Sequence, residues 1–360
     1  MRSLVLFLLL LACHAQAQSL RIAVAGISHA HVAWILGRPD KGDISLVGIY
    51  ETDTALSHRY AHRYHLPEKI FYTSLTKMLD AVKPAAVVAF GDIVSHRAVV
   101  EAAAPRHIHV MVEKPLATTV ADALAMQALA KQHQIQLLTD YETSWYPSVA
   151  KTFQLLHDSA YVGQVRKVVI NDGHQGPKEI GCGPEFLAWL TDPVRNGGGA
   201  LMDFGCYGAN LMTHLVKNRI PVSVTAVTHH YKPEVYPKVE DDAVIIVDYG
   251  DMHALIQASW NWSFSRKDME VYGDKGLLLA PDKNTLVLRN NERAPAQVRH
   301  ITATDIRVYE DPFTYLADVI HGKVTMPPYG LYAIENNVIV VRILEAARES
   351  ARTGKPVKLI

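Results

Sequence analysis

Two patterns of hydrophobic and polar positions divide the chain near residue 146. Before it, short apolar runs alternate with segments of helical periodicity, which is typical of a parallel sheet covered by helices on both faces. Ligands of such sheets bind outside the carboxyl ends of the strands, so we expect the chemistry of this chain there. The runs that predict strands are 20–26, 44–50, 85–90, 107–112 and 136–139, and the clearest helical runs are 27–37, 98–104 and 120–133.

From residue 146 onward, consecutive apolar runs are separated by short turns. They predict an antiparallel sheet with helices on one face and an open second face. A closing helix is expected over 331–352. The fold class is therefore α/β: a Rossmann-type parallel sheet over 20–145, then an α+β domain over 146–360 with a large, mostly antiparallel open sheet. The strand runs of this domain are 165–171, 222–229, 242–249, 253–260, 268–272, 276–280 and 285–289.

The first residues predict a targeting signal rather than a part of the fold. Arg2 precedes the apolar run 4–12 and the small-x-small sequence that ends at Ala17. This is typical of a secretory signal peptide over 1–17, cleaved after Ala17. The run is too short for a stable membrane span. We expect a periplasmic or secreted protein, with lipid attachment at Cys13 as the alternative.

Composition narrows the partners. The chain has 360 residues with 36 basic and 36 acidic side chains, so it lacks the basic excess that nucleic-acid binding requires. After signal cleavage, Cys182 and Cys206 remain, and their spacing leaves open whether they form a disulfide. Two thiols without a CxxC pattern are too few for a zinc site.

The turn after the first run stands where a dinucleotide fingerprint Gly-x-Gly-x-x-Gly would lie. The chain reads Gly26-Ile27-Ser28-His29-Ala30-His31, so only the first glycine is kept, and Ser28 is small enough for the second position. Glu51 follows 25 residues after Gly26, at the end of the next run. An acid there binds a ribose 2′-hydroxyl and repels a 2′-phosphate, which favours NAD over NADP. We interpret His29 and His31 as loop residues over the phosphates and expect no metal, because no third ligand is evident.

Two further motifs carry candidate acid–base chemistry. Lys114, in Glu113-Lys114-Pro115, follows a predicted strand, and its ammonium could stabilise an alkoxide or lower the pKa of a neighbour. A glycine run at 197–199 precedes Asp203 and Tyr207, which lie four residues apart and would share one face of a helix.

In this order and spacing, Glu113-Lys114-Pro115 and Gly197-Gly198-Gly199-x-x-x-Asp203-x-x-x-Tyr207 resemble the glucose–fructose oxidoreductase/inositol dehydrogenase/MocA (Gfo/Idh/MocA) family, over nearly all of the chain after the signal. The resemblance implies a nicotinamide cofactor and a sugar or polyol substrate. It implies that Lys114 orients the substrate and the nicotinamide ribose. At the position of Tyr207 the family commonly has histidine. A tyrosine there resembles the glucose–fructose oxidoreductase branch. We expect Lys114 to lower the pKa of Tyr207 for acid–base catalysis, and Asp203 to hold the substrate hydroxyl.

We therefore expect an exported NAD-dependent oxidoreductase that acts on a hydroxyl of a sugar, glycoside or polyol. The alternatives are an NAD-dependent glycoside hydrolase that works by transient oxidation and elimination, and a non-catalytic sugar-binding protein. The resemblance also implies a homo-oligomer that pairs through the open sheet. The expected catalytic residues are Lys114, Asp203, Tyr207 and His174; the cofactor contacts are Gly26, Ile27, Ser28, His29, Glu51, Phe90, Gly91, His96, Glu113 and Lys114; the substrate contacts are Trp145, Gln175, Asp192 and Arg195.

Overall fold

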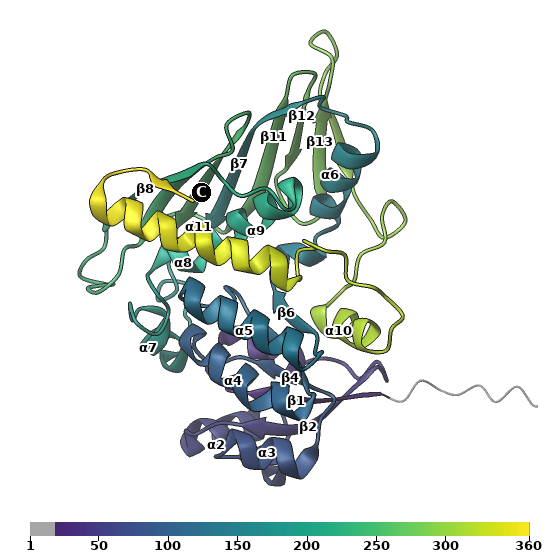
Figure 1. The fold of residues 1–360 in the computed structure, drawn as a ribbon, viewed down its shortest axis with the longest axis vertical. Coiled ribbons are helices and arrows are strands. Elements are labelled where there is room, and N and C mark those ends of the chain that lie inside the picture. Colours follow the sequence, from purple (N-terminus) through teal and green to yellow (C-terminus); the bar gives the residue numbers. More distant parts are fainter. Residues whose placement is uncertain (1–18, 360) are drawn as a thin grey trace, which may run out of the picture.

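The computed structural model describes residues 19–359, which form two sheets with helices packed against them (Figure 1). The expected signal peptide, its cleavage site after Ala17 and the alternative lipid-attachment residue Cys13 lie outside the described residues. Within the described part of the chain, no helix is long and apolar enough to cross a membrane.

The first sheet is the parallel sheet that the sequence predicts. Its six strands lie in the order β3-β2-β1-β4-β5-β6, and every neighbouring pair is parallel. Central strand β4 is buried throughout, as expected where helices cover both faces of a parallel sheet. The elements are β1 Leu20–Ala25, β2 Ile44–Tyr50, α2 Thr54–Arg63, β3 Phe71–Tyr72, α3 Leu75–Val82, β4 Ala86–Ala89, α4 His96–Ala103, β5 His109–Glu113, α5 Val120–Gln132 and β6 Leu137–Asp140.

The segment after β1 differs from the helix expected over 27–37. The backbone N–H of His29 donates to the carbonyl oxygen of Phe90 at 2.9 Å, so the chain first bridges from β1 towards the end of β4. Helical structure begins only with the 3-10 turn Ala30–Val32 and continues as the short helix α1, Ala33–Leu36. A backbone donor used between strands is not available to a regular helix.

The second sheet has nine strands in the order β14-β13-β12-β11-β7-β10-β9-β8-β15. Its pairs are antiparallel except for β7 with β10, so "mostly antiparallel" is confirmed. The sequence did not predict β14, which is exposed at every position and so has no apolar alternation. The strands are β7 Val165–Gly173, β8 Ser223–His229, β9 Asp242–Asp248, β10 His253–Ser259, β11 Arg266–Gly273, β12 Leu277–Ala280, β13 Thr285–Arg289, β14 Gln297–His300 and β15 Val357–Lys358.

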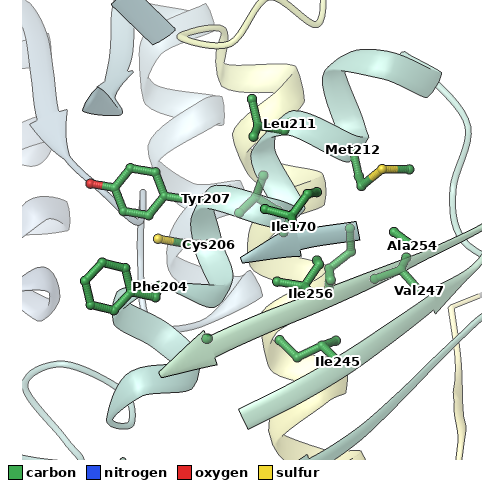
Figure 2. Packing of buried hydrophobic residues seen from close by; sticks show 14 of the residues in the cluster. Ile170, Phe204, Cys206, Tyr207, Leu211, Met212, Ile245, Val247, Ala254 and Ile256 are labelled. Atoms are coloured by element: carbon green, nitrogen blue, oxygen red, sulfur yellow. The ribbon is translucent and has the colours of Figure 1, made fainter. Parts of the chain in front are cut away.

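Helix α9, Gly205–Val216, packs directly on the second sheet. A Cβ on Gly208 would lie 2.6 Å from a methyl carbon of Ile256, so glycine lets the helix approach β10 closely. Figure 2 shows Leu211 and Met212 of α9 on the same cluster as the strand residues, while the ring of Tyr207 extends from the start of the helix with its hydroxyl directed away from them. Packing of α9 thus fixes the position of Tyr207.

Helix α11, Ile334–Thr353, joins the two halves of the molecule and confirms the expected closing helix. Figure 1 shows it crossing between the large sheet and α5. Its residues Val338 and Val341 belong to the apolar core of the first sheet, whereas Ile343 and Leu344 belong to that of the second. The remaining helices are α6 Pro147–Asp158, α7 Pro184–Leu190, α8 Ala200–Asp203 and α10 Pro312–Ile320.

Candidate active site

Lys114 directly follows β5, so its side chain starts at the carboxyl end of a central strand. Its Nζ donates to Asp203 Oδ1 at 2.5 Å and to the Asp203 carbonyl oxygen at 3.0 Å. Burial lowers the pKa of Lys114, but the acidic groups around it, Asp203 first among them, together outweigh burial and raise that pKa above its ordinary value. Lys114 is therefore a fixed, charged ammonium at the junction of the two domains.

Asp203 ends α8, and a break at Phe204 separates α8 from α9. The expectation that one helix carries Asp203 and Tyr207 on one face is therefore wrong, because two consecutive helices carry them. They still meet at Lys114, since Asp203 binds its Nζ and the centroid of the Tyr207 ring lies 5.2 Å from that atom.

The second carboxylate oxygen of Asp203 is also engaged. Oδ2 accepts a hydrogen bond from Trp260 Nε1 at 2.9 Å. Burial raises the pKa of Asp203, but the Lys114 ammonium outweighs it and keeps that pKa below its ordinary value. Asp203 is thus an ionised group that orients Lys114, and its position leaves little freedom for either side chain.

Tyr207 is 1% exposed, and its ring packs edge-on against Tyr141 at 5.5 Å between centroids. Burial raises the pKa of Tyr207 well above its ordinary value, and the Glu142 carboxylate raises it further. The expectation that Lys114 lowers this pKa is therefore wrong, because Asp203 already balances the Lys114 charge and the phenol is desolvated. In this structure Tyr207 keeps its proton at neutral pH and can donate it.

A second ammonium lies at the same ring. Lys267 Nζ is 5.1 Å from the centroid of Tyr207 and forms an ion pair with Glu142, whose other oxygen accepts from Tyr146 Oη at 2.6 Å. Burial raises the pKa of Glu142, but Lys267 outweighs it and lowers that pKa to about 2. The sequence analysis missed this pair. A signal existed, since Lys267 shares the inward-facing positions of β11 with buried Met269.

Asp172 is another residue that the sequence analysis did not single out. It lies opposite Lys267 in the pairing of β7 with β11 and faces inward, like the buried Val168 and Ile170. Neither of its carboxylate oxygens has a hydrogen-bond partner among the described residues. Burial raises the pKa of Asp172 well above its ordinary value, so this carboxyl group holds a proton.

His174 lies in the loop that follows β7 and contacts Phe204, which lies between Asp203 and Tyr207 in the sequence; its catalytic role stays a prediction. Its Nδ1 accepts the backbone N–H of Gly176 at 2.9 Å, and its ring packs edge-on against Phe204 at 4.9 Å. Burial lowers the pKa of His174 to about 4. The imidazole is therefore neutral near pH 7 with its proton on Nε2, and acts as a hydrogen-bond donor rather than as a base.

The carboxyl ends of β1 and β4 form a cradle that fits a dinucleotide. Gly26 has φ +79°, and a Cβ on it would lie 2.8 Å from Cα of Gly91, so the first glycine of the fingerprint is required. Glu51 Oε2 accepts the backbone N–H of Ile27 at 3.1 Å, and the same carboxylate borders a cavity of about 190 Å³ beside α2. These residues would hold the phosphates and the adenosine ribose of NAD.

Two sequence profiles match the chain in the same order as its two sheets. The profile described as "Oxidoreductase family, NAD-binding Rossmann fold" matches residues 20–141, and the one described as "GFO/IDH/MocA C-terminal domain" matches residues 151–279. The chain belongs to the Gfo/Idh/MocA oxidoreductase family. Membership confirms the resemblance drawn from the motifs, and with it an NAD-binding Rossmann domain and an oxidoreductase.

Known proteins resemble this chain over most of its length. It is 25% identical to trans-1,2-dihydrobenzene-1,2-diol dehydrogenase of Xenopus laevis over 265 residues, covering 72% of this chain and 75% of that protein. An inositol dehydrogenase homolog from Azotobacter vinelandii, solved with NAD⁺, has a similar fold with TM-score 0.81 at 19% identity, covering 95% and 98% of the two chains. Aldose–aldose oxidoreductase from Caulobacter crescentus, solved with glycerol, has TM-score 0.76 at 23% identity and covers 95% and 100%.

In this member of the Gfo/Idh/MocA family, Glu113 joins His29 and His31 in one cluster, so the statement that no third ligand is evident is wrong. His31 Nδ1 lies 3.1 Å from Glu113 Oε1, and His29 Nε2 lies 3.8 Å from Oε2. However, His29 Nδ1 accepts the backbone N–H of His31 at 3.0 Å, which leaves the proton of a neutral His29 on Nε2. His31 Nδ1 can donate to the Glu113 carboxylate, whereas His29 Nε2 is too far from it for a hydrogen bond. The expectation of no metal stays a prediction.

The side chains of His29 and His96, two of the expected cofactor contacts, are engaged by other protein groups. The side chain of His29 packs on Phe186 and Trp189 of α7, with ring centroids 4.6 and 5.5 Å away. His96 is buried, and its Nδ1 bonds the carbonyl oxygen of Leu116 at 3.1 Å, behind the Lys114 turn. Contacts of His29 and His96 with NAD therefore stay predictions. Either residue would act through its backbone groups or through the turn that it supports.

The four expected substrate contacts are not brought together at Tyr207. Trp145 Nε1 donates to the carbonyl oxygen of Tyr141 at 2.8 Å, and Gln175 Nε2 donates to that of Ser263 at 3.0 Å. In the loop before the glycine run, one aspartate caps its own turn and the next arginine pairs with the Rossmann domain. These are Asp192, which accepts hydrogen bonds from the N–H groups of Val194 and Arg195, and Arg195, whose Nε donates to Asp92 at 2.6 Å.

Cys182 and Cys206 form no disulfide with each other.

Proposed function

We propose that this chain is an NAD-dependent oxidoreductase that oxidises a hydroxyl of a sugar or polyol, or reduces the corresponding carbonyl. The observation that supports it most is the Lys114 ammonium, held by two atoms of Asp203 beside the protonated Tyr207 at the carboxyl end of β5. Relatives whose names state a diol dehydrogenase and an aldose–aldose oxidoreductase point to the same substrate class.

The chain's own residues supply the polar part of this reaction. When bound, NAD supplies the hydride acceptor at its nicotinamide ring. Two of the three Lys114 N–H donors engage Asp203, so the third can donate to the reacting oxygen, where the positive charge stabilises an alkoxide. Tyr207 holds a proton at its hydroxyl and, with NADH as the hydride donor, gives this proton to the same oxygen in carbonyl reduction. In the oxidative direction, the deprotonated Tyr207 takes the proton from the substrate hydroxyl.

Turnover and cofactor content test this proposal together. The purified chain is incubated with NAD and with D-xylose, D-glucose or myo-inositol, and NADH is measured, with Lys114→Met as the inactive control. We expect net NADH with at least one of these compounds. Sugar release from a glycoside without net NADH would indicate the hydrolase alternative, and protein that takes up no added NAD would indicate the sugar-binding alternative.

We propose that Glu51 selects NAD over NADP. Its carboxylate already holds the Ile27 N–H, which places it at the turn of the fingerprint. Removal of the carboxylate in Glu51→Ala removes both a ribose acceptor and a repulsive charge. We expect NAD affinity to fall about tenfold while NADP affinity changes less, as measured by titration of intrinsic fluorescence. An unchanged NAD-to-NADP ratio would contradict this assignment.

We also propose export and self-association. The basic start, apolar run and small-x-small sequence support a cleaved signal ending at Ala17. The exposed apolar Val227 of β8 and Ile246 of β9 lie on the open side of the second sheet and support a homo-oligomer. Mass determination of the mature N-terminus tests the first proposal, and sedimentation of the wild type and Ile246→Lys tests the second.

A further inference from the structure

The Lys267–Glu142 ion pair is placed differently from the other charged groups around Tyr207. Lys114 and Asp203 have side chains that are 5% and 6% exposed, whereas Lys267 and Glu142 are 21% and 28% exposed. A ligand can therefore contact the side chains of Lys267 and Glu142 more fully than those of the buried Lys114 and Asp203.

The pair also spans the two domains. Glu142 belongs to the turn after β6 at the end of the Rossmann-type sheet, and Lys267 belongs to β11 of the second sheet. Lys267 Nζ lies over Tyr207, and the charges of both members act on His31 in the turn after β1. The pair thus lies between the catalytic phenol and the turn that receives the cofactor.

Both members have unused hydrogen-bonding capacity. Within the described residues, Lys267 Nζ has one hydrogen-bond partner, so two of its three donors are free. Glu142 accepts one bond at each oxygen, from Lys267 and from Tyr146, and each carboxylate oxygen can accept a second. Lys267 can thus donate, and Glu142 can accept, hydrogen bonds with neighbouring groups of one ligand.

The surrounding charges favour a neutral, hydroxylated ligand over an acidic one. Glu142 balances Lys267, and Asp203 balances Lys114. Asp172, opposite Lys267 in the sheet, is neutral because it is buried without partners. Neither ammonium therefore carries an unbalanced charge for a carboxylate substrate.

We infer that Lys267 and Glu142 bind two neighbouring hydroxyls of the substrate, with Lys267 donating to one oxygen and Glu142 accepting from the next hydroxyl. This inference rests on the proposed function and deepens it. It assigns the substrate class as a compound with a vicinal diol beside, or including, the carbon that reacts. Lys267 and Glu142 are thus specificity-determining residues, whereas Lys114 and Tyr207 act at the reacting oxygen.

The test uses the full chain with NAD and whichever of D-xylose, D-glucose and myo-inositol is turned over. We expect Lys267→Met to raise KM about ten- to a hundredfold while kcat changes less, because charged hydrogen bonds to the substrate are lost. Glu142→Gln keeps an acceptor oxygen and should raise KM by a smaller factor. The affinity for NAD, from fluorescence titration, should stay unchanged in both variants.

Singly deoxygenated analogues of the same substrate separate binding from a structural role. With the wild type, one analogue should raise KM by a factor similar to the one that Lys267→Met causes with the intact substrate. With Lys267→Met, the same analogue should raise KM little further, because the variant and the analogue remove the same hydrogen bond. Glu185→Gln is the matched control: it breaks the ion pair of Glu185 with Arg59, which also joins the two domains but does not contact Tyr207. It should leave KM unchanged.

Several outcomes would overturn the inference. They are an unchanged KM in Lys267→Met, equal losses with all deoxy analogues in both proteins, or a loss of NAD affinity and thermal stability that parallels the loss of activity. If the wild type turns over none of the compounds, the proposed function fails, and calorimetric titration of myo-inositol into the NAD-loaded protein tests the pair separately. Equal binding to wild type and Lys267→Met, or no binding to either, would then overturn it.

Discussion

Two lysine–carboxylate pairs lie at the ring of Tyr207, and they differ in burial and connection. The Lys114–Asp203 pair is almost fully buried, and Trp260 holds its carboxylate from the other side. The Lys267–Glu142 pair is partly exposed and has free donors. A buried pair is rigid and costly to break, whereas a partly exposed pair contributes little stability and can exchange partners with a ligand. The buried pair thus suits the catalytic role that we propose for Lys114, and the exposed pair suits recognition of a ligand.

The largest expected effect comes from removing the buried ammonium. Lys114→Met leaves Asp203 as a buried carboxylate with only the Trp260 N–H as its side-chain partner, and breaking a buried pair costs about 3–5 kcal/mol. We expect an unfolding free energy lower by about 3 kcal/mol, from urea denaturation, and a fall in kcat of about 10³-fold. A double variant, Lys114→Met with Asp203→Asn, should recover stability but not activity. Recovery of activity as well would contradict the role of Lys114 at the reacting oxygen.

A smaller effect is expected at the ring between the pairs. Tyr207→Phe removes the proton donor and keeps the apolar packing against Tyr141 and Phe204. We expect kcat to fall about 10²-fold in steady-state assays, with NAD affinity and the unfolding free energy unchanged. Tyr141→Phe removes a neighbouring phenol and is the control. Wild-type rates in Tyr207→Phe would remove this residue from the mechanism.

The smallest effect concerns the exposed pair and its dependence on pH. The pKa of Glu142 is about 2 in the folded protein and 4.5 in its ordinary state, so ionised Glu142 stabilises the fold above about pH 4.5. This contribution is lost as the pH falls from 4.5 towards 2. We expect the unfolding free energies of wild type and Glu142→Gln to differ by about 1 kcal/mol at pH 6 and to converge at low pH. A constant difference between pH 6 and pH 3 would show that the ion pair does not produce it.

The sequence singled out both members of the first pair, without predicting that they bind each other, and missed the second pair for a physical reason. Lys114 and Asp203 stand in motifs whose spacing along the chain is legible, next to a predicted strand end and a glycine run. Glu142 and Lys267 are 125 residues apart, and no local pattern relates a turn after β6 to the start of β11. Only the inward position of Lys267 in an alternating strand marked it as unusual.

The sequence by itself determined the parallel sheet, the large, mostly antiparallel sheet and the closing helix, because these follow from local periodicity. It also singled out Lys114, Asp203 and Tyr207, whose catalytic roles stay predictions. The tertiary structure decided what the residues experience. Burial and the Glu142 carboxylate raise the pKa of Tyr207, and Asp203 balances the Lys114 charge expected to lower it. The approach of β5 to the first turn brings Glu113 to His29 and His31. Desolvation and long-range neighbours depend on packing in three dimensions, which spacing along the chain does not encode.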